Sequence, residues 1–297
     1  MRVDLHIHTN FSDGTFTVQE VLEEAEKLRK SIGLGVIAIT DHDDIRALHC
    51  DLSAYKGRII PGVELCFTMD GYLYDVLGYG IDVPQMDKFL GRLTHEDKIA
   101  VQNGIMRDFM AVCDANGWRY NKDLKCDIGN SHEAFNLVFS DIISHPENTK
   151  TFTYERPMFF KKHFCNPESQ FYVDQTRHLP SLDECVRAIH EAGGVAVLAH
   201  SGAYGMEEEK MREFIESSIS CGVDGIEKWY TVHTERHREI IDEYVQKHGM
   251  IVSGGSDFHG VAKPGYNIGT GQGNLEMYVE DMPWIKLLNK VIDIEDI

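Results

Sequence analysis

The N-terminal part of the chain alternates between strand-like and helix-like patterns of apolar residues. Residues 2–9 alternate strictly, which predicts a short strand with His6 and His8 on the same face. Thr17 and Glu20 have the spacing of a capping box, and apolar residues recur behind them at helical intervals. The pattern therefore predicts a first strand, a loop and a first helix.

Three apolar runs follow this helix. Residues 35–40 form an almost uninterrupted apolar run, which fits a buried parallel strand and stops before an Asp-His-Asp triplet. The runs at 58–65 and 73–81 predict two more strands, and these carry Glu64 and Asp75.

The C-terminal part repeats this alternation. Ser181 and Glu184 form a second capping-box spacing at the start of a helix. Strands alternating with helices of this length imply parallel pairing through crossover helices, which is an α/β fold. The other elements predicted here are strands at 195–200, 223–229 and 250–260 and helices at 207–220 and 234–249.

The middle of the chain breaks this alternation. A long amphipathic helix is predicted at about 85–116, and an aromatic-rich stretch without a strand–helix pattern follows it. We interpret the region as an inserted, mainly helical domain at 84–180, between barrel parts at 1–83 and 181–297. Its aromatic residues are expected to form its own core: Phe159, Phe160, Phe164, Phe171 and Tyr172.

Composition narrows the class of protein. The 297 residues are 42% hydrophobic, which is enough for one large α/β domain with a smaller appendage. No apolar run approaches the ~20 residues of a bilayer span, and the start of the chain lacks a signal-peptide pattern. We therefore expect a soluble, cytoplasmic protein without a membrane partner. The seven cysteines are scattered without a CxxC pair, which favours reduced thiols.

Net charge bears on the partners. Asp and Glu number 48 against 29 Lys and Arg, a formal charge of −19 that would repel a long nucleic acid. A small phosphate ester or nucleotide can still bind if metal ions supply positive charge. No obligate protein partner is evident.

Imidazole and carboxylate side chains gather where the predicted strands end. Ligand sites of parallel α/β folds collect at that edge, because the loops there converge. Neutral imidazole and carboxylate suit Mn²⁺, Fe²⁺ or Zn²⁺, so the pattern predicts two or three divalent metal ions. The residues concerned are His6, His8, Asp13, Asp41, His42, Glu64, His200, Asp257 and His259.

These motifs together resemble the PHP (polymerase and histidinol phosphatase) family of metal phosphoesterases. The matching segments are HIHTNFSDG, AITDHDD, IPGVE, GGVAVLAH, GSDFHG and KPGYNIG. The resemblance implies a distorted (β/α)₇ barrel with a trinuclear metal site. It also implies hydrolysis of a phosphomonoester by a metal-activated water, without a protein nucleophile.

The resemblance also implies a ligand set. The family often has His at position 75, where this chain has Asp, a harder donor that either favours Mn²⁺ or Fe²⁺ over Zn²⁺ or weakens the site. Asp41 is expected to support the ligands without binding an ion. The implied ligands are His6, His8, Glu64 and Asp257 for one ion, Asp13, His42 and His259 for a second, and Glu64, His200 and Asp75 for a third.

Substrate contacts are expected from the insertion, which is similar to that of a nucleoside 3′,5′-bisphosphate phosphatase subgroup. Lys161 replaces an Arg of that subgroup, and a further expected Lys is absent. A Lys-Lys-His run is also typical of a solvated helix face, and His233 fits a surface or capping position as well as a pocket rim. The candidate contacts are Ser131, His132, Lys161, Lys162, Arg177 and His233.

Three alternatives to a nucleotide phosphatase stay open. Histidinol phosphate phosphatase has the same chemistry on another substrate, although the inserted domain argues against it. A metal-dependent amidohydrolase usually has a metal-bridging modified Lys on a strand, and no Lys is suitably placed. A non-catalytic metal-binding module is the third, and the near-complete ligand set argues against it.

Overall fold

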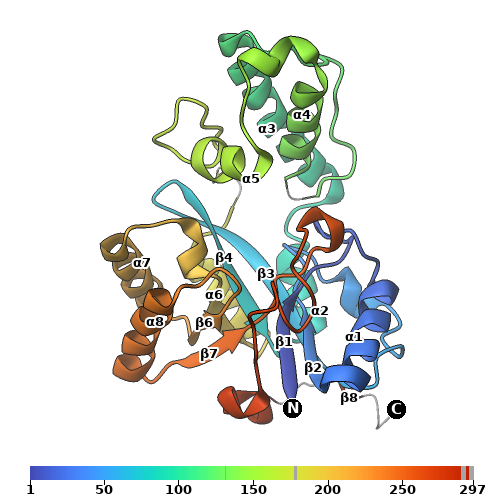
Figure 1. The fold of residues 1–297 in the computed structure, drawn as a ribbon, viewed down its shortest axis with the longest axis vertical. Coiled ribbons are helices and arrows are strands. Elements are labelled where there is room, and N and C mark those ends of the chain that lie inside the picture. The colour runs from blue at the N-terminus through green and yellow to red at the C-terminus, as the bar shows by residue number, and fades with distance from the viewer. Residues whose placement is uncertain (131, 177–178, 289–291, 294–297) are drawn as a thin grey trace. The chain divides into compact units, whose positions relative to one another are not determined.

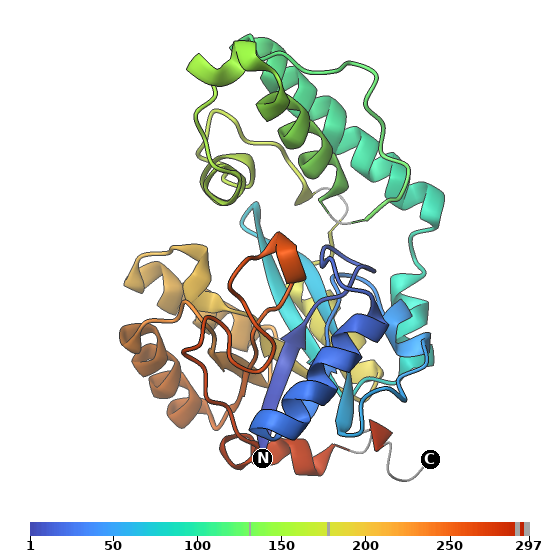
Figure 2. The same cartoon turned by 45° about the vertical axis from the view of Figure 1, so that its right-hand side comes forward.

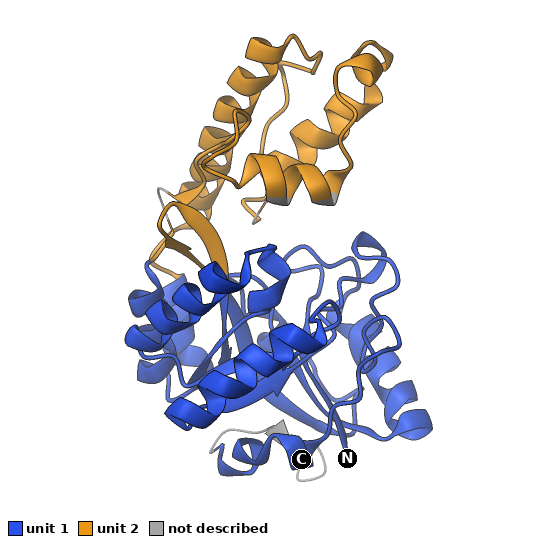
Figure 3. Cartoon of the chain, turned by 60° about the vertical axis from the view of Figure 1, so that its left-hand side comes forward, with its two compact units in different colours: residues 1–66, 75–90, 181–297 blue, residues 67–74, 91–180 orange. Residues whose placement is uncertain are grey.

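The computed structural model describes residues 1–130, 132–176, 179–288 and 292–293, with the backbone alone at 157, 161 and 292–293 (Figure 1). By internal contacts the chain divides into two compact units, coloured in Figure 3. Unit 1 consists of 1–66, 75–90 and 181–297, and unit 2 of 67–74 and 91–180. The predicted domain boundaries differ from these limits, and the domain division itself stays a prediction.

The strands follow one path from β1 to β7, with β8 added beside β3. Pairing is parallel from β1 to β3 and from β5 to β7, as the alternation of strands and helices predicts. The strands are β1 (Arg2–Ile7), β2 (Leu34–Ile39), β3 (Arg58–Met69), β4 (Tyr72–Tyr79), β5 (Val195–Leu198), β6 (Gly225–Trp229), β7 (Ile251–Gly254) and β8 (Ile292–Asp293).

Strand β4 runs antiparallel to its neighbour β5, in contrast to the parallel pairs named above. β3 continues to Met69, past the predicted end at 65, and a two-residue turn then reverses the chain into β4. Asp70 and Gly71 in this turn have φ of 53° and 81°, as a two-residue hairpin of the right twist requires. Because β4 is reversed, Asp75 near its start lies at the edge where the parallel strands end.

A bridge between Ile7 and Phe258 joins the two ends of the strand path. The amide of Asp257 donates to the carbonyl of His6 at 2.8 Å, and the amide of His8 donates to Phe258 at 2.9 Å. The architecture is thus the predicted distorted α/β barrel, closed at the edge that carries the polar side chains.

Helices cover the outer faces of these strands. α1 packs on β2, α6 on β5 and α8 on β6, and Figure 2 shows α1 alongside β1 and β2. The capping boxes at Thr17 and Ser181 are both formed, which confirms these two helix starts. The helices of unit 1 are α1 (Val18–Ile32), α2 (Val83–Leu90), α6 (Leu182–Glu191), α7 (Glu208–Ser220) and α8 (Glu235–His248).

Unit 2 has a helical fold with an aromatic core. The single helix predicted at 85–116 is instead α2 and α3, because Thr94 and Asp97 form a capping box that starts a new helix. The helices described in unit 2 are α3 (His95–Asn116), α4 (Glu133–Ser144), α5 (Arg156–Phe159) and a π-helix (Phe160–Phe164). Phe159, Phe164 and Phe171 are buried in its core, as predicted. None of the described helices has the length and apolar character of a membrane span.

Candidate metal centre

All nine predicted ligands lie together in unit 1. Strand ends, the reversed start of β4 and the loop after β1 deliver them to one place. Their ligand atoms form overlapping groups in which all atoms lie within 4.8 Å of one another. The groups are His8, Asp13, His42 and His259; His6, His8 and Asp257; His6, Glu64 and His200; and His42, Cys66 and Asp75.

Glu64 on β3 occupies the middle of this cluster. Its Oε2 atom lies 3.1 Å from His6 Nε2 and 3.2 Å from His8 Nε2. Its Oε1 atom lies 3.1 Å from His200 Nε2. A completely buried carboxylate with imidazoles on both oxygens is placed to bridge two cations.

The outward nitrogens of the imidazoles are held by other groups. His6 Nδ1 is 3.0 Å from Glu227 Oε1, and His259 Nδ1 is 2.9 Å from the backbone carbonyl of Asp257. These acceptors receive a hydrogen bond from Nδ1–H. The Nε2 atom of each neutral ring therefore has a lone pair, which faces a carboxylate. For His259 that carboxylate is Asp13, at 3.1 Å. Two facing lone pairs require a proton or a cation between them.

Several buried atoms of the cluster lack a hydrogen bond of acceptable geometry. Three of them nevertheless lie near an opposite charge: His8 Nε2 is 3.2 Å from Glu64 Oε2, Asp13 Oδ1 is 3.1 Å from His259 Nε2, and Asp75 Oδ1 is 3.9 Å from His42 Nδ1. Buried polar atoms without partners are costly, and a shared cation removes that cost. The donor set therefore fits divalent metal ions. The atoms are His8 Nε2, Asp13 Oδ1, Asp75 Oδ1 and His200 Nδ1.

The electrostatics of the cluster agree with this assignment. Burial alone would lower the pKa of His6, but Glu64, Glu227 and Asp257 outweigh it and raise the pKa well above its usual value. Burial would raise the pKa of Glu64, yet the imidazoles of His6 and His42 hold it well below. Imidazoles and carboxylates of the cluster thus offset one another's burial, although burial and the neighbouring His8 lower the pKa of His259.

Two candidate ligands have unusual backbone conformations. Asp257 has φ of 54° and His200 has φ of 24°, both in the region that non-glycine residues rarely adopt. Such strain is concentrated at functional sites, where the surrounding structure enforces it. Position 255 also has no room for a side chain, because a Cβ atom on Gly255 would overlap the Cβ atom of His6.

The sequence reasoning missed two buried carboxylates that support the ligands. Glu227 on β6 contacts His6 and also accepts from the amide of His200 at 2.9 Å. Asp4 on β1 accepts from the amides of Ser256 and Gly269 at 2.8 and 2.6 Å. For Asp4 the available signal was its position on the same strand face as His6 and His8, whereas Glu227 is followed by Lys228 on β6 and its own strand gave no such signal.

Asp41 occupies the supporting position expected for it. Its carboxylate accepts from the amide and hydroxyl of Thr9 and from the hydroxyl of Ser12, at 2.6 to 2.7 Å. Ser12 Oγ in turn lies 3.4 Å from His8 Nδ1. Asp41 thereby fixes the loop between His8 and Asp13.

The two carboxylate oxygens of Asp257 have different partners. Oδ1 lies 3.4 Å from His8 Nε2, whereas Oδ2 accepts from the Tyr230 hydroxyl at 2.6 Å and contacts the Lys263 ammonium. Burial would raise the pKa of Asp257, but Lys263 and His259 lower it well below its usual value. Tyr230 and Lys263, which the sequence reasoning did not single out, thus orient Oδ1 toward the imidazoles.

The predicted substrate contacts of the insertion belong to unit 2. His132 precedes α4 with φ of 63°, and its ring packs edge-on against Phe160 at 4.8 Å. Phe160 begins the π-helix, which also carries the exposed Lys162. Their role with substrate stays a prediction. Outside the described residues lie Ser131, Arg177 and the side chain of Lys161.

His233 is buried, so its interpretation as a surface residue is wrong. Its Nδ1 donates to the carbonyl of Lys228 at 3.0 Å, and its Nε2 accepts from the amide of Gly202 at 3.1 Å. Burial lowers the pKa of His233 to about 4. Both ring nitrogens are thus engaged by backbone, which argues against a substrate contact.

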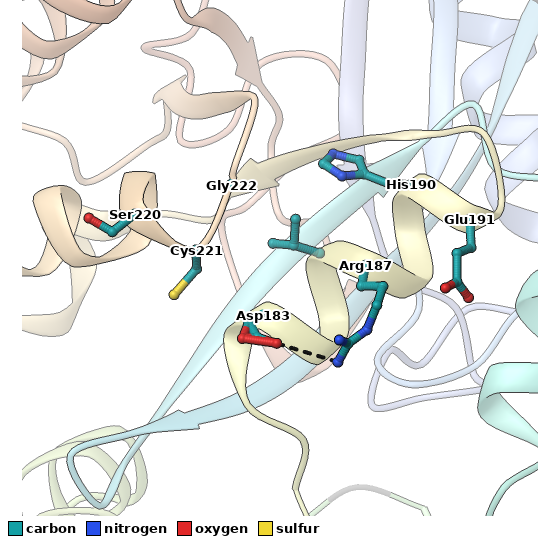
Figure 4. A pocket seen from close by; sticks show the side chains of 8 residues that line it. Asp183, Arg187, His190, Glu191, Ser220, Cys221 and Gly222 are labelled. Carbon is teal, nitrogen blue, oxygen red and sulfur yellow. Dashed lines mark hydrogen bonds and ion pairs between the residues drawn. The ribbon is translucent and has the colours of Figure 1, made fainter.

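A shallow hollow elsewhere on unit 1 has a different character. It lies between α6 and the turn after α7, and Figure 4 shows Asp183 and Arg187 paired on its α6 side. Its lining contains none of the nine predicted ligands. The hollow is therefore separate from the candidate centre.

The chain is similar to curated enzymes over most of its length. It is 28% identical over 95% of its length to a 3′,5′-nucleoside bisphosphate phosphatase of Chromobacterium violaceum, 92% of which is covered. It is 26% identical to a 5′-3′ exoribonuclease of Haemophilus influenzae, over 87% of this chain and 90% of that protein. It is also 26% identical to a phosphoribosyl 1,2-cyclic phosphate 1,2-diphosphodiesterase of Eggerthella lenta, over 86% of this chain and 94% of that protein.

Solved structures share the fold. A Chromobacterium violaceum protein described as an amidohydrolase superimposes with a TM-score of 0.69 at 23% identity, over 97% of this chain and 96% of that one. A Bifidobacterium adolescentis protein, provisionally described as a metal-dependent phosphoesterase, superimposes with a TM-score of 0.63 at 21% identity, over 96% of this chain and 94% of that one. The PHP domain family model matches residues 4–163, more than half of the chain, so this protein belongs to the PHP domain family.

Proposed function

We propose that this protein is a metal-dependent phosphoesterase that hydrolyses a phosphomonoester of a nucleotide. The observation that carries the proposal is the set of imidazole and carboxylate atoms that face one another in the buried cluster around Glu64. Membership of the PHP family and similarity to three phosphoester hydrolases support the same reaction class.

The chain's own residues divide the work. His6, His8 and Asp257 would hold one cation, Asp13, His42 and His259 a second, and His200 with Glu64 a further one. Bound divalent cations lower the pKa of water and offset the charge that develops on phosphoryl oxygens. Glu227 and Asp41 keep the imidazoles and the loop after β1 oriented, so that the donors need no rearrangement.

For the substrate, a nucleoside 3′,5′-bisphosphate or the end of a short oligonucleotide is proposed. The relative from Chromobacterium violaceum is named for the first, and the exoribonuclease is named for RNA. The net charge of −19 favours a small substrate over a long nucleic acid. Predicted contacts such as His132 and Lys162 would bind phosphate from unit 2.

The test measures phosphate release by the full-length protein after chelation and after reloading with Mn²⁺, Fe²⁺ or Zn²⁺. The panel contains adenosine 3′,5′-bisphosphate, a 5′-phosphorylated dinucleotide and histidinol phosphate. We expect metal-dependent release, fastest from a nucleotide. Release from histidinol phosphate alone would favour that alternative, and no release from any ester by the loaded protein would refute the proposal.

A further inference from the structure

We propose that Cys66 is a metal ligand and that Cys66, Asp75 and His42 form a subsite for a thiophilic divalent cation such as Zn²⁺, Co²⁺ or Cd²⁺. This inference rests on the proposed function, since it requires that the cluster binds metal. The family resemblance gave Cys66 no role and placed Asp75 with Glu64 and His200. In the structure Asp75 Oδ2 lies 3.9 Å from His200 Nε2, and Asp75 also forms a group with the thiol and His42.

Neighbouring strands place the three donors together. Cys66 follows Glu64 by two positions on β3, so both side chains project from the same face. The Cys66 Sγ atom lies 3.7 Å from His42 Nδ1, and His42 Nδ1 lies 3.9 Å from Asp75 Oδ1. The ligand atoms of all three residues lie within 4.8 Å of one another.

Asp75 supplies an independent indication of a cation. Its side chain is only 9% exposed, and its Oδ1 atom accepts no hydrogen bond of acceptable geometry. The Tyr204 hydroxyl donates to the other oxygen, Oδ2, at 3.3 Å. Tyr204 therefore holds the carboxylate with Oδ1 directed toward His42. Leaving a buried carboxylate oxygen without a donor costs free energy that a cation recovers.

His42 lies between this subsite and the neighbouring ligand group. Its Nδ1 lies 3.4 Å from Glu64 Oε2 as well as close to Cys66 and Asp75, whereas its Nε2 lies 4.0 Å from Asp13 Oδ1. The ring thus borders two adjacent cation positions, and because a neutral imidazole has a single lone pair it coordinates one of these cations at a time.

The donor set determines which cation fits. Asp75 alone is a hard donor that favours Mn²⁺ or Fe²⁺, but a thiolate selects softer ions. Cys66 is 2% exposed, so its sulfur faces other protein groups rather than solvent. On binding, the S–H bond breaks, the proton leaves to solvent and the sulfur electron pair forms the bond to the cation. The subsite should therefore prefer Co²⁺, Zn²⁺ or Cd²⁺ to Mn²⁺.

The experiment titrates Co²⁺ into the metal-stripped, full-length protein. Equilibrium dialysis counts the bound ions, and near-ultraviolet absorption detects charge transfer from thiolate to cobalt. The variants are Cys66→Ser and Cys66→Ala, with Cys221→Ser as the control, because Cys221 belongs to none of the described ligand groups. Circular dichroism verifies that each variant is folded.

We expect the band in the unmodified protein and in Cys221→Ser. Both Cys66 variants should lose it and should bind one cobalt fewer, or bind it roughly tenfold or more weakly. Cobalt that binds without a band, or a band that persists in the Cys66 variants, would overturn the role of Cys66 and leave the proposed function intact. Absence of any bound cobalt would overturn both.

Discussion

The interiors of the two units are equally buried but differ in chemistry. In unit 2, Phe109, Phe135 and Phe164 are almost completely buried, with ring centroids 4.8 Å apart for Phe109–Phe164 and Phe135–Phe164. In unit 1, His6 and Glu64 are just as inaccessible. Burying aromatic rings stabilises a fold directly, whereas burying imidazole and carboxylate groups is favourable only with compensating charge. Depth alone therefore does not define a core.

The largest expected effect is a loss of catalysis and of bound metal when a charged group in the interior of unit 1 is neutralised. Glu64→Gln removes the charge on which four imidazoles converge, so phosphate release should fall by roughly 10³-fold or more, with loss of bound metal. The measurements are initial rates and metal content. Glu243→Gln, at a half-exposed position on α8, is the control and should leave both unchanged. An active Glu64→Gln protein with full metal content would contradict the assignment of the centre.

The complementary change is Phe135→Ala on α4. It should destabilise unit 2 by about 3–4 kcal/mol, because it leaves a cavity among packed rings. Hydrogen exchange of the amides of α4 measures the loss, and Ile143→Ala, 57% exposed on the same helix, is the control. Metal content should stay unchanged, and its loss would show that the two interiors are not independent.

A smaller effect is expected from Glu227→Gln. The amide would keep the shape of the side chain but weaken its hold on His6 and on the amide of His200, so metal affinity should fall about 10–100-fold. Competition with a chromophoric chelator measures this affinity. Glu216→Gln, at an exposed position on α7, should have no effect. An unchanged affinity would show that Glu227 serves folding alone.

The smallest effect concerns pH and the buried His233. Because burial lowers its pKa to about 4 in the folded protein, from an ordinary value of 6.5, the folded state resists taking up a proton. Its neutral form therefore contributes stability above pH 6.5 that is lost as the pH falls toward 4, about 1–2 kcal/mol between pH 7 and 5. Denaturant unfolding of metal-free protein should show a weaker loss over this range in His233→Gln. Identical pH dependence in both proteins would contradict this account.

Local chemistry explains what could be predicted. The capping boxes at Thr17 and Ser181 act within four residues, and the helices start where these motifs predict. The turn at Asp70 and Gly71 was an equally local signal for the reversal of β4. Thr94 likewise marked the start of α3.

Support from distant residues could not be predicted in the same way. Glu227 contacts His6 across 221 positions, and its partner is set by the closed strand path rather than by any local pattern. The grouping of Asp75 with Cys66 depends on His42, whose Nδ1 atom lies 3.7 Å from Cys66 Sγ and 3.9 Å from Asp75 Oδ1. The ligand roles and the substrate contacts stay predictions until a loaded protein is measured.

The bridge between Ile7 and Phe258 has a consequence for biosynthesis. Because successive residues of a strand face opposite sides, this one pairing turns His6, His8, Asp257 and His259 to the same side, and a slip by one residue would turn a pair away. His6 and His259 lie 253 positions apart in the sequence, so the cluster cannot assemble on a ribosome-bound nascent polypeptide until residue 259 has emerged. A truncated translation product would retain much of the hydrophobic scaffold but would be unable to sequester metal ions.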